Sequence, residues 1–422
     1  MNKIISALLL TTALATAANA QNCVNASRCD ELGYDKSIED CKGYSTLICP
    51  FDKNKAFCST SAGISQVSDC TGLKAAAANA GTTIYITQNI SVCSLSSIAD
   101  YVSIIGDGTA KEICIGSPKT GKNVTFENLK FCGKPAGPSL KLINLSAQES
   151  KTIGFTVTDS LYIENCNLPE VTIDTGGSAD LTVKGENKLK ELQNINNINQ
   201  IDGSLTLSGR ILKINSGTFN GELTVSQIYA NDSASSFTFN GKLSAKSVRN
   251  GTYTFNTDVD IISSCSSTSV CIPVEDAKII NNKKLLIKGN DIDDSEFIIN
   301  NEANFKLNKL YTGSTGKCAN CKFTVNNQLT FWREEPNGYS DDRSLQNSEI
   351  TITANGKFYT NDNITNNVSI NYVPGAQIGL TDMDNYNGLW QATASGSYTT
   401  GGNTSFVMPP EFTKIKATSP LP

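Results

Sequence analysis

Two aspartates, Asp258 and Asp260, are the first candidates for chemistry in this chain of 422 residues. If Val259 between them lies in a strand, both carboxylates point to the same face. At about 3.4 Å per residue they are then about 7 Å apart. That separation falls within the range of the two carboxylates of inverting glycosidases, so the pair is a candidate for glycoside hydrolysis.

A second acidic group consists of Asp291, Asp293, Asp294 and Glu296. Several carboxylates could bind calcium, and a lyase would add a basic residue that accepts a proton. Only five arginines exist, at residues 28, 210, 249, 333 and 343, and neither Arg210 nor Arg249 in the predicted solenoid has a recognisable motif around it. We interpret the acidic group as a turn and assign no metal, no cofactor and no catalytic residue.

The chain contains no histidine, which excludes a serine nucleophile with a histidine base. The net charge is −5, with the charges spread along the sequence. This balance argues against nucleic acid or an anionic membrane surface as a partner.

Fourteen cysteines indicate an oxidising compartment and disulfide bonds. Cys93, Cys114, Cys132 and Cys166 either pair across neighbouring coils or are small core residues. A redox role for the motif Cys318-Ala319-Asn320-Cys321 is disfavoured, because no βαβ pattern surrounds it. The structural disulfide candidates are Cys23, Cys29, Cys41, Cys49, Cys58, Cys70, Cys265, Cys271, Cys318 and Cys321.

Residues 1–20 are predicted to be a cleaved signal peptide, with Lys3 before an apolar run and Ala18-Asn19-Ala20 at the cleavage site. The apolar run is shorter than the roughly 20 residues of a membrane span. The protein is therefore expected to be secreted, at the cell surface or in the periplasm, without a membrane span.

Short stretches with strand character follow one another from residue 82 to about 380, separated by Asn, Gly, Asp and Ser. Several repeat at intervals of roughly one solenoid coil. Thr218-Phe219-Asn220-Gly221 returns twenty residues later as Thr238-Phe239-Asn240-Gly241, and Phe297-Ile298-Ile299-Asn300-Asn301 recurs as Phe323-Thr324-Val325-Asn326-Asn327. Stacked coils share one core, and asparagines at equivalent turns can form a hydrogen-bonded ladder.

The region that begins with an Ala-rich run at Leu73 to Ala80, before Gly81, predicts a short helix. It is followed by Thr82 to Thr87, Val102 to Gly108 and Asn123 to Phe131. This order resembles the entry into secreted right-handed parallel β-helices of the pectate-lyase-like superfamily. The alternative fold, an array of β-sandwiches, would use the Asn-Gly pairs at residues 220, 240 and 250 as hairpin turns.

The resemblance implies a fold that carries polysaccharide lyases, esterases and hydrolases. Asn256-Thr257-Asp258 matches one short motif of polygalacturonase-like hydrolases, but their Gly-His-Gly is absent, and only Lys414-Ile415-Lys416 is similar to their Arg-Ile-Lys. Carbohydrate-binding faces present aromatic platforms, and Tyr85, Tyr162, Tyr253 and Tyr311 form no dense stripe.

The predicted fold class is all-β, a right-handed parallel β-helix with an N-terminal capping helix and a small disulfide-rich module. The predicted regions are a signal peptide (1–20), a Cys-rich module (21–72), the β-helix (73–380) and a C-terminal cap with a loose tail (381–422). The predicted function is a non-enzymatic, adhesin-like solenoid that presents a polar face to a glycan or a host or cell-surface protein. The alternative is a polysaccharide-active lyase or glycoside hydrolase.

Overall fold

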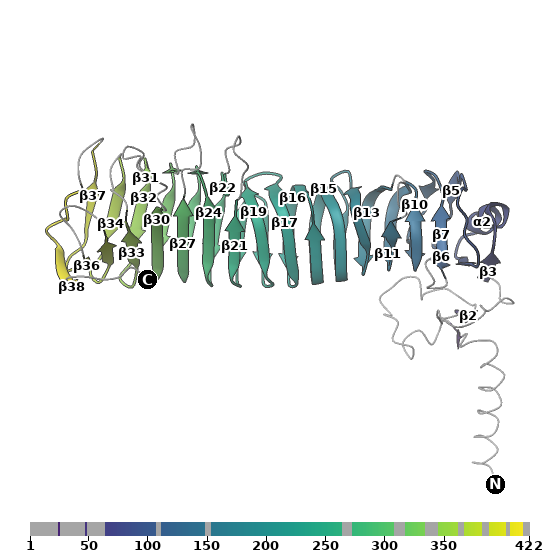
Figure 1. The fold of residues 1–422 in the computed structure, drawn as a ribbon, viewed down its shortest axis with the longest axis horizontal. Helices are drawn as coiled ribbons and strands as arrows, with labels where there is room; N and C mark the ends of the chain where they lie inside the picture. The colour runs from purple at the N-terminus through teal and green to yellow at the C-terminus, as the bar shows by residue number, and fades with distance from the viewer. Residues whose placement is uncertain are drawn as a thin grey trace, which may run out of the picture. The chain divides into compact units, whose positions relative to one another are not determined.

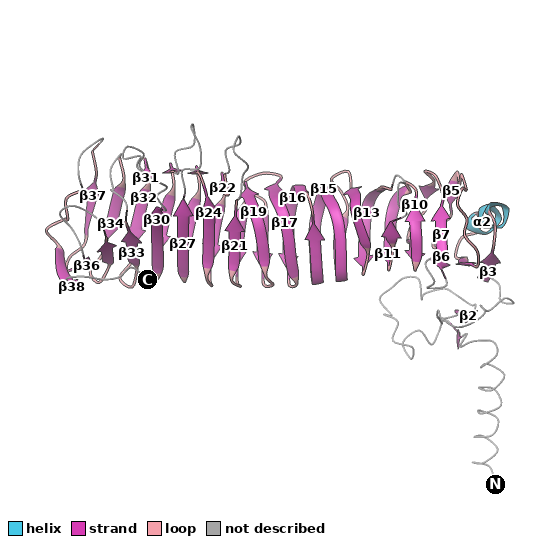
Figure 2. Cartoon of the chain, in the orientation of Figure 1, coloured by secondary structure: helices cyan, strands magenta, loops and turns pink. Residues whose placement is uncertain are grey.

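The computed structural model describes residues 24–25, 47–48, 64–106, 111–147, 153–263, 272–307, 317–333, 345–361, 367–381, 388–401 and 406–416. The chain divides into two compact units, residues 1–190 and 191–422. Figure 1 labels the elements of each unit, and Figure 2 shows that strands make up most of both. The predicted signal peptide lies outside the described residues, as does nearly all of the chain before Ile64.

The first unit is a parallel solenoid built from short strands. In it, β3, β4, β6, β9, β11, β13 and the start of β15 pair in parallel, each with the next. Two further parallel stacks, β5–β8–β11 and β7–β10–β12–β14, complete the turns. The strands are β1 (Val24–Asn25), β2 (Leu47–Ile48), β3 (Ile64–Val67), β4 (Thr83–Ile86), β5 (Ser97–Ile98), β6 (Ser103–Gly106), β7 (Lys111–Cys114), β8 (Lys119–Thr120), β9 (Val124–Glu127), β10 (Leu129–Cys132), β11 (Ala136–Ile143), β12 (Ser146–Ala147), β13 (Phe155–Glu164), β14 (Asn167–Asp174) and β15 (Asp180–Leu207), which continues into the second unit.

The described helix, α2, covers Cys70–Ala77 rather than the predicted Leu73 to Ala80. Its start moves upstream because Asp69 caps it: the carboxylate accepts a hydrogen bond from the backbone N–H of Gly72 at 2.8 Å. Gly81 has a positive φ of 73° but is not the helix cap. Its N–H donates to the carbonyl of Asp100, so Gly81 is already part of the first turn.

The second unit repeats the same three-sheet plan with regular register. Sheet A stacks β17, β19, β21, β24, β27, β30, β33 and β35. Sheet B stacks the end of β19 on β22, β25, β28 and β31, and sheet C stacks β16, β18, β20, β23, β26, β29, β32 and β34. The two units together contain about 14 turns.

The strands of the second unit after β15 are β16 (Arg210–Phe219), β17 (Glu222–Ala230), β18 (Ser236–Phe239), β19 (Leu243–Arg249), β20 (Thr252–Phe255), β21 (Val259–Ile262), β22 (Val274–Glu275), β23 (Lys278–Asn281), β24 (Leu285–Gly289), β25 (Ile292–Asp293), β26 (Glu296–Ile299), β27 (Glu302–Leu307), β28 (Cys318–Ala319), β29 (Lys322–Val325), β30 (Gln328–Arg333), β31 (Leu345–Gln346), β32 (Glu349–Ile352), β33 (Lys357–Thr360), β34 (Ser369–Tyr372), β35 (Gln377–Leu380), β36 (Gly388–Ala392), β37 (Gly396–Thr399) and β38 (Phe412–Lys416).

The predicted all-β parallel solenoid is confirmed, and the sandwich array is wrong, because every described strand pair between β3 and β35 is parallel. The sequence repeats are stacked neighbours: Phe219 lies beside Phe239 and Phe297 beside Phe323. Their rings stack at centroid distances of 4.4 Å and 5.0 Å. Antiparallel pairing occurs at the two ends of the described chain. Near the N-terminus β1 pairs with β2. Beyond Leu380, β36 pairs with β35, β37 with β34 and β38 with β36.

Asparagines form the predicted ladder along the second unit. Each Nδ2 donates to the Oδ1 of the asparagine one turn earlier, at 2.8–2.9 Å. The ladder consists of Asn220, Asn240, Asn256, Asn282, Asn300 and Asn326. The Asn-Gly pairs at residues 220 and 240, which the sandwich alternative read as hairpin turns, join successive sheets of the solenoid instead.

Candidate functional site

The outward side of sheet B carries charged groups on consecutive turns. Residues aligned by register form one row across it, which we name the sheet B row: Tyr229, Arg249, Glu275, Asp293, Ala319 and Gln346. Adjacent members are separated by one strand spacing, about 4.8 Å. The alternate residues, such as Val274 and Ile292, are fully buried in the core, so the row faces outward.

Arg249 connects its two neighbours in this row. Its Nη1 lies 2.7 Å from Oε2 of Glu275, and its guanidinium lies 5.1 Å from the centre of the Tyr229 ring. Both the arginine and the glutamate side chains are only about one quarter exposed. Partial burial strengthens such a pair relative to one in open solvent, and the ring holds the guanidinium plane in place.

The members of the predicted acidic group do not lie together, because one of them, Asp294, occupies the left-handed position of a turn. Asp294 has a positive φ of 49°. The residues at the equivalent position of other turns also have a positive φ, between 48° and 57°: Asn250, Asp276, Asn320 and Asn347. Asn and Asp tolerate this left-handed conformation better than other residues with a side chain, which explains why they recur there. Asp294 therefore has a structural role, and its Oδ1 accepts a hydrogen bond from Asn320 at 2.9 Å.

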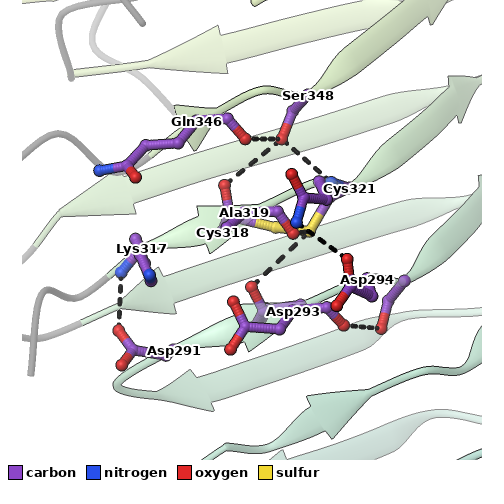
Figure 3. The surroundings of a disulfide bond; sticks show 12 residues. Asp291, Asp293, Asp294, Lys317, Cys318, Ala319, Cys321, Gln346 and Ser348 are labelled. Atoms are coloured by element: carbon purple, nitrogen blue, oxygen red, sulfur yellow. Dashed lines mark hydrogen bonds between the residues drawn. A yellow bond between two sulfur atoms is a disulfide. The ribbon is translucent and has the colours of Figure 1, made fainter.

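Two other members of the predicted acidic group, Asp291 and Glu296, have separate partners on different parts of the solenoid. Asp291 accepts the backbone N–H of Lys317 at 3.0 Å (Figure 3), and Glu296 on sheet C pairs with Lys278 at 2.9 Å. Among the described residues, no three His, Cys, Asp or Glu side chains converge as metal ligands would. Only Asp293 belongs to the outward row.

Asp293 is the carboxylate of the row with an altered acidity. Burial raises the pKa of its carboxyl, the nearby Lys317 lowers it, and the neighbouring Asp291, Asp294 and Glu275 raise it again. The net direction is upward. Asp293 therefore binds a proton more readily than an ordinary aspartate, whereas its neighbour Glu275 is paired with Arg249.

A disulfide lies one turn of the solenoid after Asp293, beside Ala319, which is aligned with Asp293. Cys318 and Cys321 are bonded to each other, and both are fully buried (Figure 3). The hydroxyl of Ser348 accepts the N–H of Cys321 at 3.1 Å and donates to the carbonyl of Gln346 at 2.9 Å. The disulfide and this hydroxyl hold the backbone beneath Ala319 and Gln346, at the end of the row.

Asp258 and Asp260 are not part of the sheet B row. Asp258 is exposed in a turn, and its Oδ1 accepts the backbone N–H of Lys284 at 3.1 Å. Asp260 lies on sheet A, aligned with Ser244 and Leu286. These two aligned neighbours of Asp260 are uncharged, whereas Asp293 is aligned with Glu275 and also has Lys317 nearby.

The remaining cysteines occupy several environments. Cys70 is bonded to Cys93, and Cys114 is bonded to Cys132. Both bonds join successive parts of the first unit. Cys166 is a free thiol with no exposed surface. Cys23, Cys29, Cys41, Cys49, Cys58, Cys265 and Cys271 lie outside the described residues.

Sequence reasoning noted Arg249 but missed Tyr229 and Glu275. The available signal was spacing: Arg249 and Glu275 are each followed by a residue of the left-handed turn, Asn250 and Asp276. Aligning the chain on these turns, rather than on its strands, would have brought Arg249, Glu275 and Asp293 into one row.

Comparison with known protein families, curated proteins and solved structures finds no match to this chain. Within the described residues, no helix is long and apolar enough to cross a membrane.

Proposed function

We propose that this protein is an exported, non-enzymatic solenoid of the pectate-lyase-like, right-handed kind, which presents a polar face to a glycan or a protein partner. It would act outside the cytoplasm, as a structural or adhesin-like component. The capping helix and the disulfide-rich N-terminal module belong to this proposal. Its support is the arrangement of polar residues on the outward faces.

The observation that carries the proposal is the outward row of sheet C. Lys278, Glu296, Lys322 and Glu349 are aligned on four successive turns, and Lys278 Nζ lies 2.9 Å from Glu296 Oε1. Opposite charges that alternate at each strand spacing neutralise one another and keep the face polar without a concentrated charge. A repeated surface of this kind suits a partner that is itself extended.

Glycan-array binding by the purified protein, combined with an assay for released reducing ends, tests this function. Binding without release of reducing ends is expected, and substitution of Lys322 by Glu should weaken it because three acidic residues would then adjoin. Release of reducing ends would overturn the non-enzymatic assignment. Binding of extracellular protein but not glycan would identify the other partner class.

A second candidate, a polysaccharide-active enzyme, is favoured by one observation: Arg249, Glu275 and Asp293 lie on three consecutive turns. The raised pKa of the Asp293 carboxyl suits a general acid, and Glu275 supplies a second carboxyl group in the neighbouring turn. If cleavage is detected, Asp293→Asn should abolish it, whereas Asp258→Asn and Asp260→Asn should leave it unchanged. Loss of cleavage in either control variant would instead place the chemistry at Asp258 and Asp260.

A further inference from the structure

The outward face of the first unit changes character along the solenoid. Register places Tyr85, Ile105, Glu127, Ile143 and Glu164 in one outward row on β4, β6, β9, β11 and β13. The residues that alternate with them, including Ile84, Ile104 and Phe126, are fully buried in the core. The row therefore points away from the interior at every turn.

The first members of this row are nevertheless buried. Tyr85 is 0% exposed and Ile105 is 9% exposed, and Thr125 in the adjacent outward row is 6% exposed. Further along the same face, Ile143 and Glu164 are partly exposed. Something therefore covers this face over β4 and β6 and part of β9, where Thr125 is buried but Glu127 is partly exposed.

Burial also changes the chemistry of Glu127. The pKa of its carboxyl is raised, first by burial and then by the nearby Glu164, although Asn128 donates a hydrogen bond to it at 3.2 Å. A carboxylate on an open outward face would remain well hydrated. Glu127 is itself partly exposed, so the edge of the cover lies at β9.

The position of the chain indicates what covers this face. Helix α2 packs on β3 and β4, whereas the buried outward residues continue to β6 and β9. Residues 21–63 lead directly into β3, in which Gln66 is aligned with Tyr85. This segment thus meets the solenoid one strand away from the covered face.

The composition of residues 21–63 fits such a surface. The segment contains four aromatic residues, Tyr34, Tyr44, Phe51 and Phe57. It is too short to bury a sizeable core of its own, so its apolar side chains gain stability by packing on an existing surface. A face with Tyr85 and Ile105 offers that surface at the place where the segment joins the solenoid.

We propose that the outward face of β4, β6 and β9 is the docking surface for residues 21–63 of the same chain. The N-terminal segment then packs against the first turns of the solenoid and is not a separate module. This inference does not depend on the proposed function.

Site-specific photo-crosslinking in the full-length protein tests the occupant. Benzoyl-phenylalanine in place of Tyr85 or Ile105 should crosslink, within one chain, to peptides from residues 21–63. The matched control is the same group in place of Ile143, in the same row but partly exposed, and it should give no such product. Crosslinks from 85 and 105 to residues 107–110, to a second copy, or to nothing would overturn the proposal.

A second measurement avoids the unnatural residue. Tyr85→Ser combined with Ile105→Ser should accelerate tryptic cleavage after Lys42, Lys53 and Lys55 by about tenfold or more, because burial of each side chain contributes to holding the segment. Ile143→Ser should leave that rate unchanged. Equal cleavage rates in the double variant and the unmodified protein, with solenoid hydrogen exchange intact, would contradict the docking.

Discussion

At the scale of single residues, the left-handed positions show which side chains the turns require. Asn194 and Lys213 are equivalent positions on neighbouring turns, because Gln193 aligns with Leu212 and Ile195 with Ile214. Both have a positive φ, 52° and 54°. Asparagine tolerates this conformation, whereas lysine has no local hydrogen bond to offset the steric cost.

Lys213→Asn is therefore expected to stabilise the second unit by about 0.5–1 kcal/mol. Lys246→Asn is the control, because Lys246 is an exposed lysine within the strand β19 and has no positive φ. The control should be neutral or slightly destabilising, since asparagine is disfavoured in strands. Amide hydrogen exchange of the flanking turns measures both effects, and an unchanged opening free energy for Lys213→Asn would contradict the steric argument.

The raised pKa of Asp293 predicts a pH dependence with a definite sign. A carboxyl whose folded pKa lies above its unfolded value binds more protons in the folded state, so its ionisation lowers stability as the pH rises. Asp293→Asn should thus raise the melting temperature at pH 7, by the equivalent of about 0.5 kcal/mol for a partly exposed charge. Near pH 3, below the ordinary aspartate value of 3.8, the difference should disappear. An equal gain at both pH values would exclude the charge as its cause.

Some residue environments could not be predicted from the sequence. Asn281 and Asn282 are neighbours of the same type, yet Asn282 belongs to the exposed ladder, whereas Asn281 is fully buried in line with Phe255 and Ile299. The Nδ2 of Asn281 donates to the carbonyls of Lys283 and Glu302. Those carbonyls come from the local turn and the next coil, so local sequence does not distinguish the two asparagines.

At the scale of elements, the asparagine ladder is the feature that repetition predicted best, because equal turns place equal side chains at equal heights. Asn282→Ala removes two ladder bonds, one to Asn256 and one from Asn300. Asn326→Ala removes one, the bond to Asn300. At about 0.5–1 kcal/mol per bond, the interior variant should lose about twice as much stability as the end variant. Equal losses by amide exchange would show that the ladder bonds are not additive.

The disulfides should differ in their contribution because they close loops of different length. The bond between Cys318 and Cys321 spans 3 residues in sequence, and the bond between Cys70 and Cys93 spans 23. Loop-closure entropy then gives about 2 kcal/mol and about 3.5 kcal/mol. Replacing each pair by alanines should cost more at Cys70 and Cys93. Equal losses of local stability by hydrogen exchange would rule out loop closure as the dominant effect.

Elements that depend on local contacts were predicted with less success than the repeats. The helix was placed three residues too late because its start is set by the side chain of Asp69, whereas the prediction relied on alanine content. Cys70 begins this helix and is bonded to Cys93. That bond depends on how the first turn folds back, which cysteine spacing alone does not reveal.

At the scale of the molecule, the candidate site depends on register across turns of unequal length. Arg249, Glu275 and Asp293 are aligned although the loops between them differ, so a fixed repeat length misplaces them. Asp258 and Asp260, in contrast, were chosen because they are close in sequence. Local spacing predicted strands and ladder positions, and the outward row required the three-dimensional stacking.

The number of cysteines leads to a prediction for the whole chain. Of fourteen cysteines, six form the three described disulfides and Cys166 is free, which leaves seven. An odd number cannot pair completely within one chain. A monomer must therefore carry at least one thiol besides Cys166, or that cysteine is bonded to another molecule.

Maleimide labelling of the non-reduced protein should show this second thiol. Burial raises the pKa of the Cys166 thiol to about 11, so in the folded protein it has little thiolate and no access to the reagent. We expect at least two labels per monomer after denaturation, and one fewer in the Cys166→Ala variant. A variant with no label that migrates as a monomer would contradict this expectation. Its thirteen cysteines are an odd number and cannot all be in disulfides within one chain, so one of them would have to be chemically modified. A disulfide-linked dimer on a non-reducing gel would instead place the unpaired cysteine at an intermolecular bond, and peptide mapping of that bond would identify it among the seven.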